Sequence, residues 1–261
     1  MNVLMIGDIV GRPGRTAVIK LVNQLKIEYK IDLVVANGEN AAGGNGITKE
    51  IYEELLEVGI DVVTMGNHVW DKKEIMSFIS AADKLVRPAN YPVGTPGQGY
   101  KIVTAKSGEK LGVINLSGRV FLSNLECPFT QVNKIVTEIK RITPNILIDF
   151  HAEATSEKVA FGWYMDGRVS AVCGTHTHIQ TADARILPNG TAYITDVGMT
   201  GPRDSVLGVK KELVINKFIT HLPVRFEVAS GPAQLNGVVV MIDSQTGKAH
   251  NIQIIQKYIE N

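Results

Sequence analysis

The sequence of 261 residues predicts an α/β protein with two β-sheets. In the first half, short apolar runs alternate with segments whose apolar residues recur at helical spacing, which is typical of βαβ units in a mostly parallel sheet. The last third is rich in strand and turn signals, which favours a second sheet. Because no repeat, low-complexity tract or linker interrupts the chain, we expect a single domain over 1–261, with a small cap formed within 70–125.

The first half contains three expected strands, each followed by a polar turn. These strands are expected at 3–6, 33–36 and 60–65. A glycine-rich turn at 7–14 precedes a helix over 18–27, where apolar residues return every three or four positions. Thr48 is the expected N-cap of a second helix, which Gly59 is expected to end.

The rest of the chain carries more strand signals than helix signals. Strands are expected at 100–104, 111–116, 146–150, 169–173, 224–228, 237–242 and 252–255. Helices are expected around 131–139 and 156–165, where the apolar spacing lengthens again. Asn189-Gly190 between two apolar runs indicates a hairpin, and 200–202 is expected to form a loop.

Composition excludes several classes of protein. A formal net charge of +1 without runs of like charge gives no global attraction to nucleic acid or a membrane surface. Cys127 and Cys173 lie far apart without a CxxC pair, which argues against a disulfide framework or a thiolate metal site. The apolar runs are too short to span a bilayer, and the N-terminus does not have the pattern of a signal peptide. We therefore expect a soluble, cytoplasmic protein with no membrane partner.

Side chains of metal-binding type follow the expected strands. They are Asp8, Glu39, Asn40, Asn67, His68, His151, His176 and His178. Taken singly, most of them are more easily explained as turn, cap or core residues. His176 and His178, for example, would point to opposite sides of an extended chain and could share a site only if the turn is kinked. Their common position favours one site, because sites of open α/β sheets form beyond the carboxyl ends of the strands.

The kinds of ligand predict a centre with two metal ions. Carboxylates, amide oxygens and imidazoles without thiolates suit iron, manganese or zinc. Seven of these residues, all but His68, are taken as candidate ligands, which is too many for one tetrahedral ion but sufficient for two ions that share a carboxylate. Two ions about 3.5–4 Å apart can hold a hydroxide and stabilise an in-line displacement at phosphorus. The residues therefore predict a two-metal phosphoesterase.

At this point the motifs resemble a known family, the calcineurin-like metallophosphoesterases. The motifs are Gly7-Asp8, Asn37-Gly38-Glu39-Asn40, Gly66-Asn67-His68, Asp149-Phe150-His151 and Gly174-Thr175-His176-Thr177-His178. Longer runs around them, such as 8–12, 37–44 and 66–71, are similar to the narrower YmdB-like branch over essentially the whole chain. Val10 stands where the broad family has the histidine of Asp-x-His, and Glu39 where it has a bridging aspartate. Both departures are typical of the YmdB-like branch.

The resemblance implies a two-sheet α/β/β/α sandwich of the metallophosphoesterase type. It also implies a phosphodiesterase that acts on 2′,3′-cyclic nucleotides, commonly with two iron ions. One ion would be bound by Asp8, Glu39, Asn40 and His178, and the second by Glu39, Asn67, His151 and His176. Glu39 would bridge them, a metal-bridging hydroxide would attack phosphorus, and His68 would give a proton to the leaving ribose oxygen.

The sequence leaves several alternatives open. The same centre could serve a phosphomonoesterase or 5′-nucleotidase, or a regulatory protein that only binds a nucleotide, and manganese or zinc could replace iron. Arg12 could neutralise a substrate phosphate, or form a salt bridge or a turn contact. Asp149 and Glu153 could orient metal-bound imidazoles. The expected partner is a small phosphodiester or nucleotide, RNA remains a candidate source of it, and a homo-oligomer is compatible with the sequence.

Overall fold

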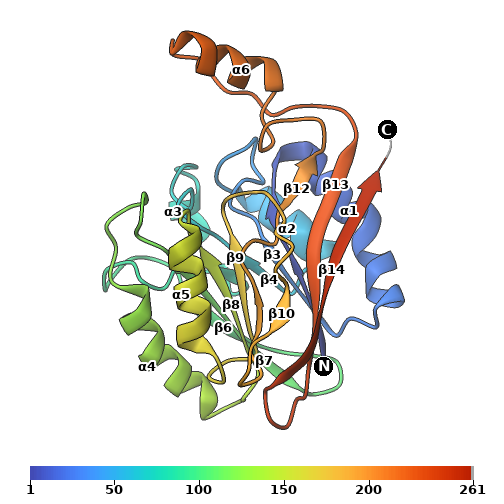
Figure 1. The fold of residues 1–261 in the computed structure, drawn as a ribbon, viewed down its shortest axis with the longest axis vertical. Coiled ribbons are helices and arrows are strands. Elements are labelled where there is room, and N and C mark those ends of the chain that lie inside the picture. The colour runs from blue at the N-terminus through green and yellow to red at the C-terminus, as the bar shows by residue number, and fades with distance from the viewer. Residues whose placement is uncertain (260–261) are drawn as a thin grey trace.

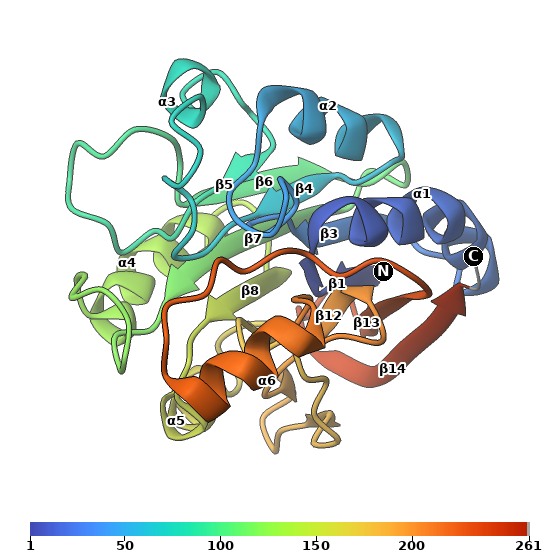
Figure 2. The ribbon, with the colours of Figure 1, turned by 90° about the horizontal axis from the view of Figure 1, so that it is seen from above.

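A computed structural model describes residues 1–259 as four layers, in which two β-sheets pack face to face and helices cover both outer faces (Figure 1). Viewed from above, α1 and α2 lie outside one sheet, while α4 and α5 lie on the far side of the other (Figure 2). The predicted two-sheet α/β/β/α sandwich is confirmed.

The first sheet combines a parallel half with an antiparallel half. It contains β1 (Asn2–Ile6), β2 (Asp8–Ile9), β3 (Leu33–Asn37), β4 (Val62–Thr64), β5 (Leu85–Val86), β12 (Met199–Pro202), β13 (Ala233–Ile242) and β14 (Ala249–Ile259). Strands β1, β3, β4 and β5 are parallel neighbours in that order. Strand β13 pairs antiparallel with β1, β12 and β14, and β12 also pairs parallel with the short strand β2.

The second sheet has a parallel centre and antiparallel edges. It contains β6 (Tyr100–Thr104), β7 (Lys110–Ser117), β8 (Ile146–His151), β9 (Ala171–Thr175), β10 (Arg185–Ile186) and β11 (Ala192–Ile194). Its order is β10-β11-β9-β8-β7-β6, with β7, β8, β9 and β11 parallel and the edge strands β6 and β10 antiparallel to their neighbours.

Alternation along the strands divides the core into three parts. The helices are α1 (Gly11–Glu28), α2 (Lys49–Glu57), α3 (Ile75–Phe78), α4 (Pro128–Lys140), α5 (Thr155–Met165) and α6 (Lys211–Thr220). In β1, Leu4 and Ile6 pack toward α1 and α2, whereas Val3 and Met5 pack between the sheets. This two-residue period is what a strand buried on both faces requires. A third cluster joins the outer face of the second sheet to α4 and α5.

Several local predictions are confirmed. Thr48 caps α2, and its hydroxyl accepts a hydrogen bond from the Ile51 N–H at 3.3 Å. Asn189-Gly190 lies in the turn between the antiparallel strands β10 and β11. Both cysteines are free, as expected. Within the described residues, no helix combines the length and apolarity needed to cross a membrane.

Three predictions about local structure are wrong. Helix α1 begins at Gly11 rather than near residue 18, because its glycines serve close packing: a Cβ on Gly14 would lie 2.3 Å from the Thr200 carbonyl oxygen. The segment 200–202 belongs to β12 instead of a loop, since it gains two strand partners that are distant in sequence. The segment 224–228 forms only an isolated bridge between Val228 and Val209.

Helix α6 and the segments next to it project from the sandwich (Figure 1). The segment 70–125, where a cap was expected, contributes α3 and three strands, β5, β6 and β7, to the body of the fold.

Candidate metal centre

The predicted metal-binding residues come together beyond the carboxyl ends of strands from both sheets. From the first sheet, Asp8 begins β2 just after β1, Glu39 and Asn40 follow β3, and Asn67 follows β4. From the second sheet, His151 is the last residue of β8, and His176 and His178 follow β9. The backbone N–H of His176 donates to Asp8 Oδ2 at 3.3 Å, which joins the two sheets at this point.

One part of the centre surrounds the Nε2 atom of His151. Glu39 Oε1 lies 3.1 Å from this atom, Asn67 Oδ1 2.9 Å and His176 Nδ1 3.0 Å. Glu39, His151 and His176 can all present a ligand atom within 4.8 Å of one another. Glu39 and His151 are fully buried, so these polar atoms face one another instead of solvent.

The other part of the centre contains two buried oxygen atoms that have no hydrogen-bond partner among residues 1–259. They are Asp8 Oδ1 and Asn40 Oδ1, and Asp8 Oδ1 lies 3.9 Å from His178 Nε2. The Asn40 amide nitrogen donates to the Gly44 carbonyl at 3.1 Å, which leaves its oxygen free. A buried oxygen without a partner costs free energy, and coordination to a cation would satisfy an oxygen of either kind. The donor set therefore fits a metal ion.

His151, His176 and His178 each have one ring nitrogen that faces the centre, here called the inner nitrogen, and one that points away from it, the outer nitrogen. In each ring the outer nitrogen forms a hydrogen bond. His178 Nδ1 donates to the Leu207 carbonyl at 3.0 Å, and His176 Nε2 lies 2.9 Å from Glu153 Oε2. Because a carbonyl or carboxylate only accepts, the proton of each ring is fixed on that outer nitrogen. The inner nitrogen then presents a lone pair to the centre, an arrangement typical of metal-binding histidines.

His151 is oriented by a relay that starts at the buried carboxylate of Asp149. The Thr175 hydroxyl donates to Asp149 Oδ1 at 2.6 Å and lies 2.9 Å from His151 Nδ1. Since its proton is already used, this hydroxyl must accept the Nδ1–H of His151, which leaves Nε2 for the centre. Asp149 Oδ2 also accepts hydrogen bonds from Thr64 at 2.5 Å and from Asn37 at 3.0 Å. A role of Asp149 in orienting a histidine of the centre was anticipated, whereas the roles of Thr175 and Thr64 were missed.

A kinked turn lets His176 and His178 reach the same centre. Both residues have positive φ angles, 100° and 67°, so the chain is not extended and the two imidazoles do not diverge. Gly66 leaves space for the side chains of Glu39 and His151. An added Cβ there would lie 2.3 Å from Glu39 Oε2 and 2.4 Å from His151 Nε2. The glycine is therefore needed for the backbone to pass this close to the centre.

The protein alone gives the centre an excess of negative charge. Burial raises the pKa of Asp8 to about 6. Burial opposes protonation of His151, yet the carboxylates of Glu39, Asp8 and Asp149 together raise its pKa to about 9. Burial and the positive charge of His151 lower the pKa of His176 to about 3, which leaves that ring neutral. Without metal, the proton on His151 thus supplies positive charge that a bound cation would replace.

His68 stands beside this cluster and is partly open to solvent. Its backbone N–H donates to Glu39 Oε2 at 3.2 Å, and its Nδ1 lies 2.8 Å from Asp71 Oδ2. Asn45 donates to the same oxygen of Asp71 at 3.0 Å. The side chain is 36% exposed, so Nε2 can reach a ligand that enters from solvent. Asp71 was not predicted as a functional residue, although its spacing of three from His68 was visible in the sequence.

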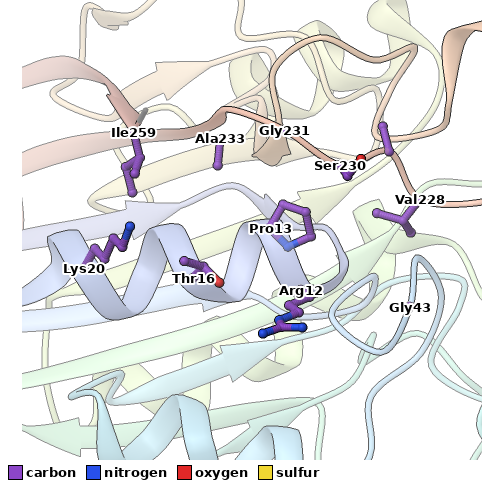
Figure 3. Close-up of a pocket in the computed structure, with 11 residues that line it drawn as sticks. Arg12, Pro13, Thr16, Lys20, Gly43, Val228, Ser230, Gly231, Ala233 and Ile259 are labelled. Carbon is purple, nitrogen blue, oxygen red and sulfur yellow. The ribbon is translucent and has the colours of Figure 1, made fainter. Parts of the chain in front are cut away.

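Arg12 lies on the first turn of α1. It lines a separate cavity of about 450 Å³ between α1 and the segment that leads into β13, together with Pro13, Thr16 and Lys20 (Figure 3). Among residues 1–259, no hydrogen bond or ion pair joins the Arg12 side chain to the metal-type residues. Its role in binding a substrate phosphate stays a prediction.

The chain is similar to known proteins over nearly its whole length. The family model described as YmdB-like protein matches residues 4–255. The chain is 58% identical over 255 residues to the "2′,3′-cyclic-nucleotide 2′-phosphodiesterase" of Bacillus subtilis (strain 168), covering 98% of this chain and 96% of the relative.

Two solved structures have the same fold over the whole chain. A hypothetical protein from Thermus thermophilus superposes with a TM-score of 0.93 at 41% identity, with full coverage of both chains. A phosphatase from Mycoplasma pneumoniae gives the same TM-score at 37% identity, covering 100% of this chain and 94% of its own.

Proposed function

The chain belongs to the YmdB-like protein family, and from this premise we propose that it is a metal-dependent phosphodiesterase that hydrolyses 2′,3′-cyclic nucleotides. One structural observation carries the proposal. The outer nitrogen of each of the three histidines is hydrogen-bonded, and the inner nitrogens of His151 and His178 face the buried carboxylates of Glu39 and Asp8. A site that only bound a nucleotide by hydrogen bonds would have no use for such a set of converging lone pairs.

We propose the following assignment of ligands. Asp8, Glu39, Asn40 and His178 hold one ion, while Glu39, Asn67, His151 and His176 hold the other. Glu39 suits the bridging position because one of its oxygens faces His151 and the other accepts the His68 N–H. Iron is the proposed metal, with manganese and zinc as the alternatives that this donor set also accepts. When bound, two divalent ions supply Lewis-acid charge for the phosphate and lower the pKa of a water that serves as nucleophile.

His68 is the proposed proton donor. Asp71 Oδ2 lies 2.8 Å from Nδ1 of the ring and so orients Nε2, the atom from which the proton would be transferred. In hydrolysis of the P–O2′ bond, the oxygen of water adds to phosphorus as the bond to O2′ breaks. The water gives up one proton to solvent, the Nε2 proton of His68 goes to the departing O2′, and His68 then regains a proton from solvent. The product is a nucleoside 3′-phosphate. RNA cleaved to 2′,3′-cyclic ends would be a source of the substrate.

Hydrolysis of 2′,3′-cyclic AMP by protein of known metal content tests the proposal. Wild-type protein should hold about two ions per chain, and His68→Ala should lower kcat roughly 10²- to 10⁴-fold with the metal content retained. His250→Ala, at an exposed histidine on β14, is the matched control and should leave both quantities unchanged.

Each part of the proposal can fail separately. A His68→Ala variant that turns over at the wild-type rate would remove the proposed acid, and about one ion per chain would contradict the shared-carboxylate centre. Turnover of 5′-AMP in place of the cyclic nucleotide would instead support a nucleotidase.

A further inference from the structure

A buried ion pair that the proposed chemistry does not use lies next to the turn of His176 and His178. Lys158 of α5 and Asp196, which follows β11, are 1% and 0% exposed, and the Lys158 Nζ lies 2.6 Å from Asp196 Oδ2. Burying two charges is costly, and such a pair is weak evidence for added stability. Its place in the fold indicates another use.

The carboxylate of Asp196 holds the middle residue of that turn at two points. Asp196 Oδ2 accepts hydrogen bonds from the Thr177 backbone N–H at 3.0 Å and from the Thr177 hydroxyl at 2.7 Å. Its other oxygen accepts the N–H of Gly198 at 2.8 Å. With Lys158, the carboxylate therefore accepts four hydrogen bonds. An amide could not do the same, because its NH₂ group would face donors.

Thr177 separates the two residues whose backbone is strained. His176 and His178 both lie at positive φ, a region that residues with a side chain rarely adopt and keep only where surrounding contacts determine it. The hydrogen bonds of Thr177 supply such contacts, because they fix both the peptide N–H and the side chain between the two histidines.

The approach of Lys158 to Asp196 requires a second glycine. The stem of Lys158 passes Gly174 at the end of β9, where an added Cβ would lie 3.3 Å from Lys158 Cδ and 1.8 Å from the Thr195 carbonyl oxygen. Each residue of the segment 174–178 therefore has a distinct role. Gly174 leaves space for the stem of Lys158, and Thr175 supplies the hydroxyl that links Asp149 to His151. His176 and His178 are the proposed ligands, and Thr177 between them is held by Asp196.

We propose that Lys158 and Asp196 are positioning residues, which hold Thr177 so that His176 and His178 present their inner nitrogens to the metal centre. Lys158 compensates the charge of the carboxylate, and the carboxylate fixes the turn. This inference rests on the proposed function, because it assumes that both histidines bind metal.

Titration of metal-free protein with Mn²⁺ tests the inference without relying on turnover. Thr177→Val keeps the branched shape and the backbone N–H but removes the hydroxyl bond to Asp196, and should weaken Mn²⁺ binding about tenfold to a hundredfold. Thr177→Ser restores the hydroxyl and should bind Mn²⁺ within about threefold of wild type, a rescue that loss of general stability would not produce.

A second variant guards against a failure to fold. Lys158→Met combined with Asp196→Asn leaves no unpaired buried charge, and should remain folded by circular dichroism while its Mn²⁺ affinity falls at least as far as that of Thr177→Val. Arg87→Met is the matched control, because Arg87 is also a buried cation that holds a loop, through the carbonyls of Thr95 and Pro96. It should lower stability and leave Mn²⁺ affinity unchanged.

Wild-type Mn²⁺ affinity in Thr177→Val, or an equal loss in Arg87→Met, would overturn the inference. Failure of the proposed function has a different signature, in which wild-type protein binds Mn²⁺ tightly but does not hydrolyse 2′,3′-cyclic AMP.

Discussion

Replacing Asp8 with asparagine should stabilise the metal-free protein while it weakens metal binding. Burial raises the pKa of Asp8 from its ordinary value of 3.8 to about 6. A tenfold change in a proton equilibrium corresponds to about 1.4 kcal/mol, so the ionised carboxylate lowers the free energy of unfolding by about 3 kcal/mol at pH 8. Asparagine has nearly the shape of the protonated carboxyl group and does not carry this penalty.

The sign of the effect fixes its pH dependence. Because the pKa of Asp8 is higher in the folded state, the penalty is small below about pH 4, where both states are protonated, and is complete once the pH exceeds about 6. Asp8→Asn should therefore unfold at a higher urea concentration than wild type at pH 8, in EDTA. The gain in the free energy of unfolding should fall to about half at pH 5.

Two results would refute this reasoning. One is a variant no more stable than wild type at pH 8, and the other is a gain that does not change between pH 5 and pH 8. Excess Mn²⁺ should cancel the advantage of the variant, because an ion at a hundred times its dissociation constant stabilises the wild-type protein by about 2.7 kcal/mol. Asp204→Asn, at an exposed carboxylate, is the control and should change stability by less than about 0.5 kcal/mol.

Substitutions at three other residues probe the candidate metal centre and the core. Gly66→Ala should abolish binding of the ion nearest His151, because the added Cβ would lie 2.4 Å from its Nε2; metal content of the purified variant checks this, and two ions per chain would contradict it. Thr175→Val should weaken Mn²⁺ affinity about tenfold to a hundredfold, since the relay from Asp149 to His151 is cut. Thr175→Ser should restore the affinity, and equal titrations of the two variants would exclude the relay. Phe161→Ala should lower the free energy of unfolding by about 3–5 kcal/mol, because this fully buried ring stacks on Phe150 with 4.2 Å between the ring centroids. Urea unfolding measures the loss, and a loss below about 1 kcal/mol would show that the cavity collapses.

Structural features that depend only on residues close together in the sequence could be predicted. The alternation of apolar runs and helical spacing predicted the parallel strands β1, β3 and β4, and the Thr48 cap was predicted at the right residue. The eight metal-type and acid candidates were selected for the same reason, since each lies at the end of a strand or shortly after it and parallel strands end at one edge.

Predictions that depend on distant partners could not be made in this way. Residues 200–202 carry turn-forming Gly and Pro, yet they form β12 because β2 and β13 approach them from the two ends of the chain. Helix α1 likewise begins within a glycine-rich segment because those glycines allow contact with β12. In both cases tertiary packing outweighs local propensity.

The division is similar within the candidate centre. By itself, the sequence determined the chemical types of the ligands and their order, because those are properties of residues and of the strands that precede them. Only the tertiary structure decided which nitrogen of each histidine faces the centre, because the partners that fix the rings, Leu207 and Thr175, come from other strands and loops. It also decided that the two histidines converge, because Asp196 holds the turn between them from nearly twenty residues away.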